Sequence, residues 1–144
     1  MWWIRPVGSE PRVSAPVESG PPFYPHDYRK LAAMPRVGFW YPADPSYYEP
    51  GDPELALPRV ASAVDLSWGG ESREIVLAHV RLGDVAASCR GWSDCRLCGK
   101  RNGSQDFTDG RYVWPSGFDH YISEHGVRPP REFVAHCVRV ARGA

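Results

Sequence analysis

Two cysteines and two histidines follow one another in the order Cys95-Arg96-Leu97-Cys98, 21 further residues that begin with Gly99, His120, four further residues and His125. Thiolates two residues apart can bind one metal ion from a tight turn, and a glycine directly after the second cysteine suits that turn. Two imidazoles from a later helix can complete a tetrahedron around the same ion. The pattern C-x2-C-x21-H-x4-H therefore predicts a structural zinc site on Cys95, Cys98, His120 and His125.

The residues between the two pairs predict how the pairs are brought together. Asp109-Gly110 separates two segments of strand-like composition, 106–108 and 111–114, and is a strong signal for a two-residue hairpin. Residues 115–119 lead into a short helix with both histidines at its end, and Gly126 is placed to terminate it. Because residues five apart lie about 140° apart around an ideal helix, we expect this helix to loosen or end between His120 and His125.

Other roles for these residues stay open. Cys89 lies six residues before Cys95 and could replace one histidine as a ligand. The two cysteines of the motif could form a redox pair, although their flanks have turn chemistry, whereas a thioredoxin-like motif follows a strand and opens a helix. Glu124 could act as a general base if the metal had three protein ligands, but four ligands leave no position for water.

The remaining cysteine and two other histidines have no predicted role in a site. We expect Cys137 to be a small apolar residue buried on the last helix. His26 and His79 are expected to be ordinary helix or loop residues without a partner. No phosphate-binding loop, serine nucleophile motif or recognisable carboxylate pair is present in the sequence.

The N-terminal part of the chain differs in composition from the rest. Twelve of the fifteen prolines and five of the seven tyrosines lie in residues 1–58. This composition predicts an extended segment that packs around residues 59–144, or alternatively an exposed aromatic surface that binds a partner. Within it we expect strands at Met1–Val7 and Val37–Tyr41, one or two helical turns in Pro25–Met34 and a loop at Pro42–Pro58.

Residues 59–144 carry stronger signals of regular structure. We expect a short helix at Arg59–Asp65, the best helix of the chain at Ser72–Leu82 with Gly83 as its C-terminal cap, and a strand at Val85–Ser88. A last helix follows Pro129-Pro130. The predicted fold class is therefore α+β: a small irregular domain with a zinc-knuckle, hairpin and helix module and an N-terminal wrap.

Charge and hydropathy restrict the classes of function. The chain has 144 residues, 17 basic and 17 acidic, and 42% of its residues are hydrophobic. Residues 1–58 have a net charge of −2 and the rest +2, so neither part is polarised enough to bind nucleic acid mainly by electrostatics. No apolar run approaches the roughly 20 residues that span a bilayer. We therefore expect a cytoplasmic protein without membrane association.

A longer pattern of residues surrounds the four predicted ligands. It consists of Cys89-Arg90-Gly91-Trp92-Ser93, Cys95-Arg96, Cys98-Gly99, Asn102-Gly103-Ser104, Thr108-Asp109-Gly110, Tyr112, Trp114-Pro115, Gly117, His120-Tyr121, His125, Val127-Arg128, Pro130 and Glu132-Phe133. This pattern, over roughly Ile75 to Cys137, resembles a group of small uncharacterised bacterial proteins from high-GC genomes. The resemblance implies a zinc-binding module on the four positions named above, but it implies no activity. The excess of arginine over lysine, 15 against 2, fits such a source.

The sequence favours one function and leaves two alternatives. A closed metal site, a neutral charge and an aromatic N-terminal part favour a non-enzymatic adaptor that binds a protein partner. Zinc modules also bind nucleic acids, and basic residues cluster near the cysteines, but residues 89–128 hold six basic and five acidic residues. A zinc-dependent hydrolase is the further alternative, which would require an open metal position.

Overall fold

The computed structural model describes residues 28–88 and 91–143. In chain order it contains α1 (Tyr28–Ala33), α2 (Gly70–Arg81), β1 (Asp84–Ser88), β2 (Gln105–Thr108), β3 (Val113–Pro115), α3 (Phe118–His125) and α4 (Arg131–Ala141). Short 3-10 helices also occur at Pro45–Tyr47, Pro53–Ala56 and Val60–Ala63. Helices combined with a small antiparallel sheet confirm the predicted α+β class.

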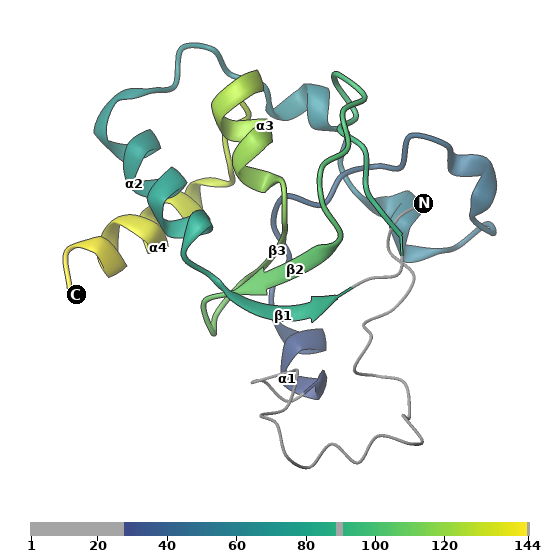
Figure 1. Cartoon of the computed structure of the whole chain (residues 1–144), viewed down its shortest axis with the longest axis horizontal. Helices are drawn as coiled ribbons and strands as arrows, with labels where there is room; N and C mark the ends of the chain where they lie inside the picture. Colours follow the sequence, from purple (N-terminus) through teal and green to yellow (C-terminus); the bar gives the residue numbers. More distant parts are fainter. Residues whose placement is uncertain (1–27, 89–90, 144) are drawn as a thin grey trace.

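The sheet is antiparallel and has the order β1-β2-β3 (Figure 1). The predicted hairpin joins β2 to β3, and Thr108 pairs with Val113 at its closed end. The connection therefore spans four residues, 109–112, and is longer than the predicted two-residue turn. Its first residue explains the difference, because one carboxylate oxygen of Asp109 accepts hydrogen bonds from the backbone N–H groups of Arg111 and Tyr112.

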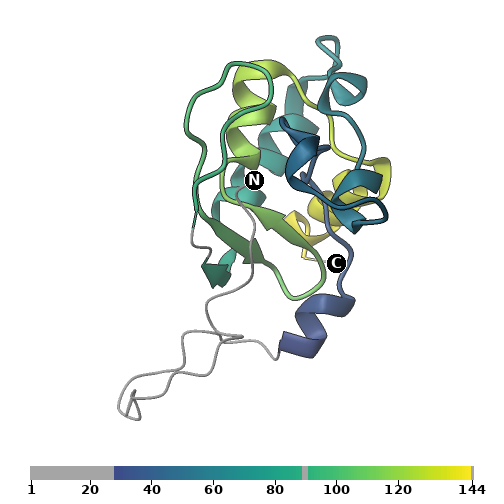
Figure 2. The same cartoon turned by 90° about the vertical axis from the view of Figure 1, so that its right-hand side faces the viewer.

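Helices α2, α3 and α4 lie together on one side of the sheet, whereas α1 lies apart from them (Figures 1 and 2). Helix α2 packs against both α3 and α4. Apolar residues at helical spacing, such as Val76, Leu77 and Val80 of α2, are buried in the shared core. The predictions of helices at Ser72–Leu82 and after Pro129-Pro130 are thus confirmed, as is the burial of Cys137.

Residues 34–64 run along this core mostly without regular strands. Val37, Trp40 and Val60 are buried in it, and the backbone N–H of Val37 donates to the carbonyl of Val113. The predicted strand at Val37–Tyr41 is wrong, because pairing with β3 is limited to one isolated bridge at Arg36.

The neighbouring predictions for this segment have mixed outcomes. One helix, Tyr28–Ala33, occupies the predicted turns of Pro25–Met34. A 3-10 helix at Val60–Ala63 stands in place of the predicted helix at Arg59–Asp65. The predicted loop at Pro42–Pro58 contains two 3-10 helices, each capped by an aspartate, and the predicted strand at Met1–Val7 lies outside the described residues.

Gly83 lies two residues after Arg81, the last residue of α2, and its role is not the predicted one. The C-cap is Leu82, and Gly83 lacks the positive φ of a left-handed cap. A Cβ atom at Gly83 would lie 2.6 Å from Cζ2 of Trp114 and 3.1 Å from Cβ of Phe107. The glycine is therefore needed because the chain passes directly over a buried indole ring.

Two predictions remain, one on membrane association and one on the division of the chain into two parts. In the described part of the chain, no helix is both long and apolar enough to cross a bilayer. The division of the chain at residue 58 stays a prediction.

Replacing Gly83 by Ala tests the close approach to Trp114. The added methyl group must displace the indole, so we expect Gly83→Ala to lower the free energy of unfolding by about 1–3 kcal/mol. Gly69→Ala is the matched control, because no atom lies within 4 Å of a Cβ there and its φ of −168° is ordinary extended backbone. Urea unfolding followed by circular dichroism measures both, and equal stability of the two variants would contradict the explanation.

Candidate metal centre

The two cysteines of the motif lie on a small hairpin formed by residues 93–103. Backbone hydrogen bonds close it: Ser93 N–H to Gly103 O at 2.8 Å, Asn102 N–H to Ser93 O at 2.7 Å and Cys95 N–H to Lys100 O at 2.8 Å. The turn itself has a positive φ of 77° at Gly99, where a Cβ would meet no other atom. The hairpin lies beside α3 in both views of the molecule (Figures 1 and 2).

The tip of this hairpin presents both sulfur atoms to one side. The backbone N–H of Gly99 donates to the carbonyl of Cys95 at 2.9 Å, which closes a tight turn around the two cysteines. The N–H of Leu97 points at Sγ of Cys95, 3.3 Å away. Such N–H···S contacts stabilise a thiolate, the form of cysteine that binds metal ions. The predicted knuckle geometry is present.

Helix α3 carries both histidines. It begins after Gly117 and ends before Gly126, and both glycines have a positive φ, so the predicted terminator is confirmed. The expectation that the helix loosens or ends between the histidines is wrong, because the helix is continuous to His125, its last residue. The side chains nevertheless converge, with imidazole centroids 5.0 Å apart. Arg73 of α2 fixes this end of α3 by donating to the carbonyls of Ile122 and Ser123.

Hairpin and helix together bring the four predicted ligands into one group. One ligand atom from each of Cys95, Cys98, His120 and His125 lies within 4.8 Å of the other three. Sγ of Cys98 is 3.4 Å from Nε2 of His120. These residues could hold a metal ion such as zinc, because their number, donor types and proximity are those of a tetrahedral Cys2His2 site.

A buried nitrogen without a partner is the sharpest sign that this group fits a metal ion. Nε2 of His125 is buried and makes no hydrogen bond to any described residue. Leaving a polar atom in this state costs free energy, which a metal–nitrogen bond would recover. Burial, and then the neighbouring His125, lower the pKa of His120, which favours the neutral imidazole that can act as a ligand.

Tyr121 supports the cysteine turn from α3. Its hydroxyl oxygen accepts a 2.7 Å hydrogen bond from the backbone N–H of Arg96, which lies between Cys95 and Cys98 in the sequence. Burial raises the pKa of Tyr121 to about 12, so the phenol stays neutral at physiological pH. The Arg96 side chain is also held in place, by the carbonyls of Tyr41 and Asp94 and the hydroxyl of Ser93. The turn is therefore fixed relative to α3 by contacts other than the ligands.

The sequence left open other roles for Cys89, for the two motif cysteines and for Glu124. Cys89 lies outside the described residues, so its role as an alternative ligand stays untested, and the same holds for His26. The structure gives Cys95, Cys98 and Cys137 as free thiols. Glu124 is exposed on α3 and is not part of the Cys2His2 group.

A second group of metal-binding side chains was not expected from the sequence. His79 of α2 and His136 of α4 both contact Oδ2 of Asp109 through Nε2, at 2.7 and 2.6 Å. The expectation that His79 has no partner is therefore wrong. Burial acts to raise the pKa of Asp109, but hydrogen bonds from His79, Tyr112, Arg111 and His136 outweigh it and hold the carboxyl well below its usual range. No local spacing indicates this group, because His79 and His136 lie 30 and 27 residues from Asp109.

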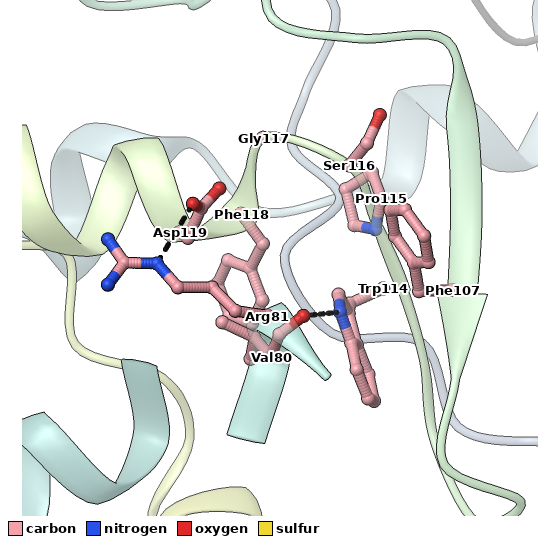
Figure 3. A pocket seen from close by; sticks show the side chains of 9 residues that line it. All are labelled: Val80, Arg81, Phe107, Trp114, Pro115, Ser116, Gly117, Phe118 and Asp119. Carbon is pink, nitrogen blue, oxygen red and sulfur yellow. Dashed lines mark hydrogen bonds and ion pairs between the residues drawn. The ribbon is translucent and has the colours of Figure 1, made fainter. Parts of the chain in front are cut away.

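The structure also has a small surface cavity of about 200 Å³ between α2, β3 and the start of α3 (Figure 3). Trp114 and Phe118 line it, with an ion pair between Arg81 and Asp119 on its rim. Among the described residues, no member of either His-containing group lines this cavity. It therefore adds no reactive group to the candidate metal centre.

Comparison of the chain with protein-family models, with curated proteins and with solved structures gave no match. The resemblance to small bacterial proteins consequently stays a prediction. The function is inferred from the geometry of the Cys2His2 group and its surroundings.

Replacing Tyr121 by Phe tests the support of the cysteine turn. Tyr121→Phe leaves the backbone N–H of Arg96 without its acceptor, so we expect the affinity for zinc to fall roughly 10-fold to 100-fold. Tyr47→Phe is the control, because Tyr47 is 68% exposed and distant in sequence from the group. Competition with a chromophoric chelator measures both affinities. An unchanged affinity in Tyr121→Phe would show that the hydroxyl does not position the turn.

Proposed function

We propose that Cys95, Cys98, His120 and His125 bind one structural zinc ion and that the chain is a zinc-stabilised module that binds a protein partner. The observation that carries the zinc site is the convergence of a tight cysteine turn and a helix on one point, with the buried Nε2 of His125 left without any other partner. The resemblance to bacterial proteins with the same motif agrees with this proposal.

The donor set favours zinc over other common metal ions. Two thiolates and two imidazoles are soft and borderline ligands, whereas magnesium and calcium require oxygen ligands. Zinc has no preference for a planar or octahedral arrangement and accepts the tetrahedron that four such side chains provide. Within the described chain, the Cys2His2 group is the one that contains cysteine.

A structural role follows from the number of ligands. Four protein ligands complete the coordination of zinc and leave no position for a reactive water molecule. The hydrolase alternative would need one ligand to withdraw and Glu124 to face the metal. The zinc ion instead links a hairpin with few buried side chains, Ser93 and Cys95, to a helix that is embedded in the core.

The surface next to the group supports binding of a protein. Trp92 is 56% exposed and Leu97 is 39% exposed, and both lie on or beside the cysteine hairpin. The guanidinium of Arg101 lies 5.4 Å from the centre of the Trp92 ring. Tryptophan and arginine are the residue types that most often dominate protein–protein affinity, especially on a rigid support.

The nucleic-acid alternative has less support from the same region. Arg96, one of the basic residues near the motif, has its guanidinium bonded to three groups of the chain itself. Lys100 and Arg101 remain exposed, but two cations provide little of the phosphate neutralisation on which such binding depends.

Metal substitution tests the zinc site. Loading the chain with Co²⁺ should produce a thiolate-to-cobalt absorption band equivalent to one thiolate-bound ion per chain. Cys98→Ser should weaken this band and lower the stability of the chain, because metal binding is coupled to folding. Cys137→Ala is the control for the band, since it removes a thiol outside the group. Absence of the band in the parent, or its survival unchanged in both Cys98→Ser and His125→Ala, would refute the assignment.

Capture of partners tests the protein-binding role. The immobilised chain is exposed to a nuclease-treated lysate of its source organism, and retained proteins are identified by mass spectrometry. We expect a partner that is retained at high salt and lost with Trp92→Ala, but kept with Tyr47→Ala, which removes a more exposed aromatic ring elsewhere. Retention that is seen only from a lysate without nuclease treatment would favour nucleic acid, and retention unaffected by Trp92→Ala would contradict this surface.

A further inference from the structure

His79, Asp109 and His136 meet from three separate elements of the fold. His79 lies on α2, Asp109 is the first residue after β2, and His136 lies on α4. Both Nε2 atoms approach the same carboxylate oxygen, Oδ2, at 2.7 and 2.6 Å. The three side chains are only 11–13% exposed. Such a concentration of polar groups in a mostly buried place needs an explanation.

The surrounding residues hold these three side chains in fixed positions. The other oxygen of Asp109, Oδ1, accepts the backbone N–H groups of Arg111 and Tyr112 at 2.8 and 2.9 Å, which aims Oδ2 at the imidazoles. Aromatic rings flank the imidazoles: Trp114 lies 5.7 Å from His79, and Tyr112 lies 5.0 Å from His136, measured between ring centroids. In metal sites, the ligand side chains are typically oriented in this way by hydrogen bonds and packing with residues that do not themselves bind the metal.

We propose that Nε2 of His79, Oδ2 of Asp109 and Nε2 of His136 form a second metal site that binds a divalent first-row transition-metal ion such as Zn²⁺. The donor atoms lie within 4.8 Å of one another. Two imidazoles and one carboxylate are a ligand combination that such ions accept, and the proposal does not depend on the zinc site at the cysteines.

Binding of the ion requires a small outward movement of the ligands. Ligand atoms about 2 Å from a tetrahedral zinc ion are roughly 3.3 Å apart, compared with the 2.6–2.7 Å hydrogen bonds in this structure. The ion would take the place of the two Nε2 protons, each of which moves to Nδ1 of a neutral imidazole or is released to water from an imidazolium. The movement needed is a fraction of an ångström for each imidazole. Side-chain rotations can supply it, because all three residues keep some exposure to solvent.

This site would differ in chemistry from the Cys2His2 group. Three protein ligands leave at least one coordination position for water or another small ligand. The retained exposure of the three side chains provides a route for that ligand. The site is therefore of the open type, in which a metal-bound water or anion can be exchanged.

Asp109→Asn separates this proposal from a purely structural hydrogen-bond network. In that network each imidazole donates to Oδ2, and an Asn side-chain NH2 has two protons that could serve two imidazoles of the opposite tautomer. Asn can also keep the turn, because its carbonyl oxygen can accept the two backbone N–H groups. The variant thus preserves hydrogen bonding and removes the anionic ligand.

A Co²⁺ titration of the full chain, followed by absorption spectroscopy and by metal analysis after removal of excess ion, provides the test. We expect two ions per chain in the parent, one with the thiolate-to-cobalt band and one with d–d bands alone. Asp109→Asn should lose only the second ion, and Cys98→Ser should weaken only the thiolate band. His136→Gln provides the same measurement if Asp109→Asn fails to fold.

The outcomes distinguish the two metal sites from each other. One ion per chain in the parent with the thiolate band present would overturn the second site and leave the first intact. Two ions retained in folded Asp109→Asn would also overturn it, because the carboxylate would then not be a ligand. A thiolate band that is missing while the d–d bands persist would overturn the Cys2His2 site alone.

Discussion

Burial of the Trp114 side chain is the constraint on which the rest of the fold depends. The indole is 1% exposed, and its Nε1 donates a 3.1 Å hydrogen bond to the carbonyl of Val80 near the end of α2 (Figure 3). Phe133 of α4 is in T-shaped contact with the ring, with centroids 5.8 Å apart, and the backbone at Gly83 lies close to another part of the indole. A single residue of β3 therefore fixes α2 and α4 against the sheet, and α3 begins only a few residues further along the chain.

The members of the two His-containing groups alternate along the chain, but the two groups have different surroundings. Residues 91–103 contribute only Ser93 and Cys95 to the buried set of described residues, so hydrophobic burial alone supplies little to hold them. A metal ion bound to Cys95, Cys98 and α3 would supply the missing cross-link. The group of His79, Asp109 and His136 instead lies against an aromatic core that is already packed, so its polar atoms are not needed for cohesion.

Sequence reasoning succeeded where the signal is local. The cysteine spacing, the Asp-Gly turn, the 3.6-residue periodicity of α2 and the prolines before α4 each depend on neighbouring residues, and each predicted element is present. The prediction of a strand at Val37–Tyr41 was wrong because Phe39 and Trp40 are buried by side-chain packing, and such packing does not require a paired strand. The continuity of α3 was missed because long imidazole side chains can converge across 140° of helix without any break in the backbone.

Asp109 shows why the group of His79, Asp109 and His136 could not be predicted from the Asp109-Gly110 turn. Asp-Gly was sufficient to predict a turn, and the turn uses only Oδ1 of the carboxylate. Asn-Gly would serve that purpose equally well, because both side chains offer one carbonyl-type oxygen to the backbone. The need for a carboxylate arises only at Oδ2, from two imidazoles that come from α2 and α4. The turn therefore explains the contacts of Oδ1, and the convergence of α2, α4 and the β2–β3 turn explains the contacts of Oδ2.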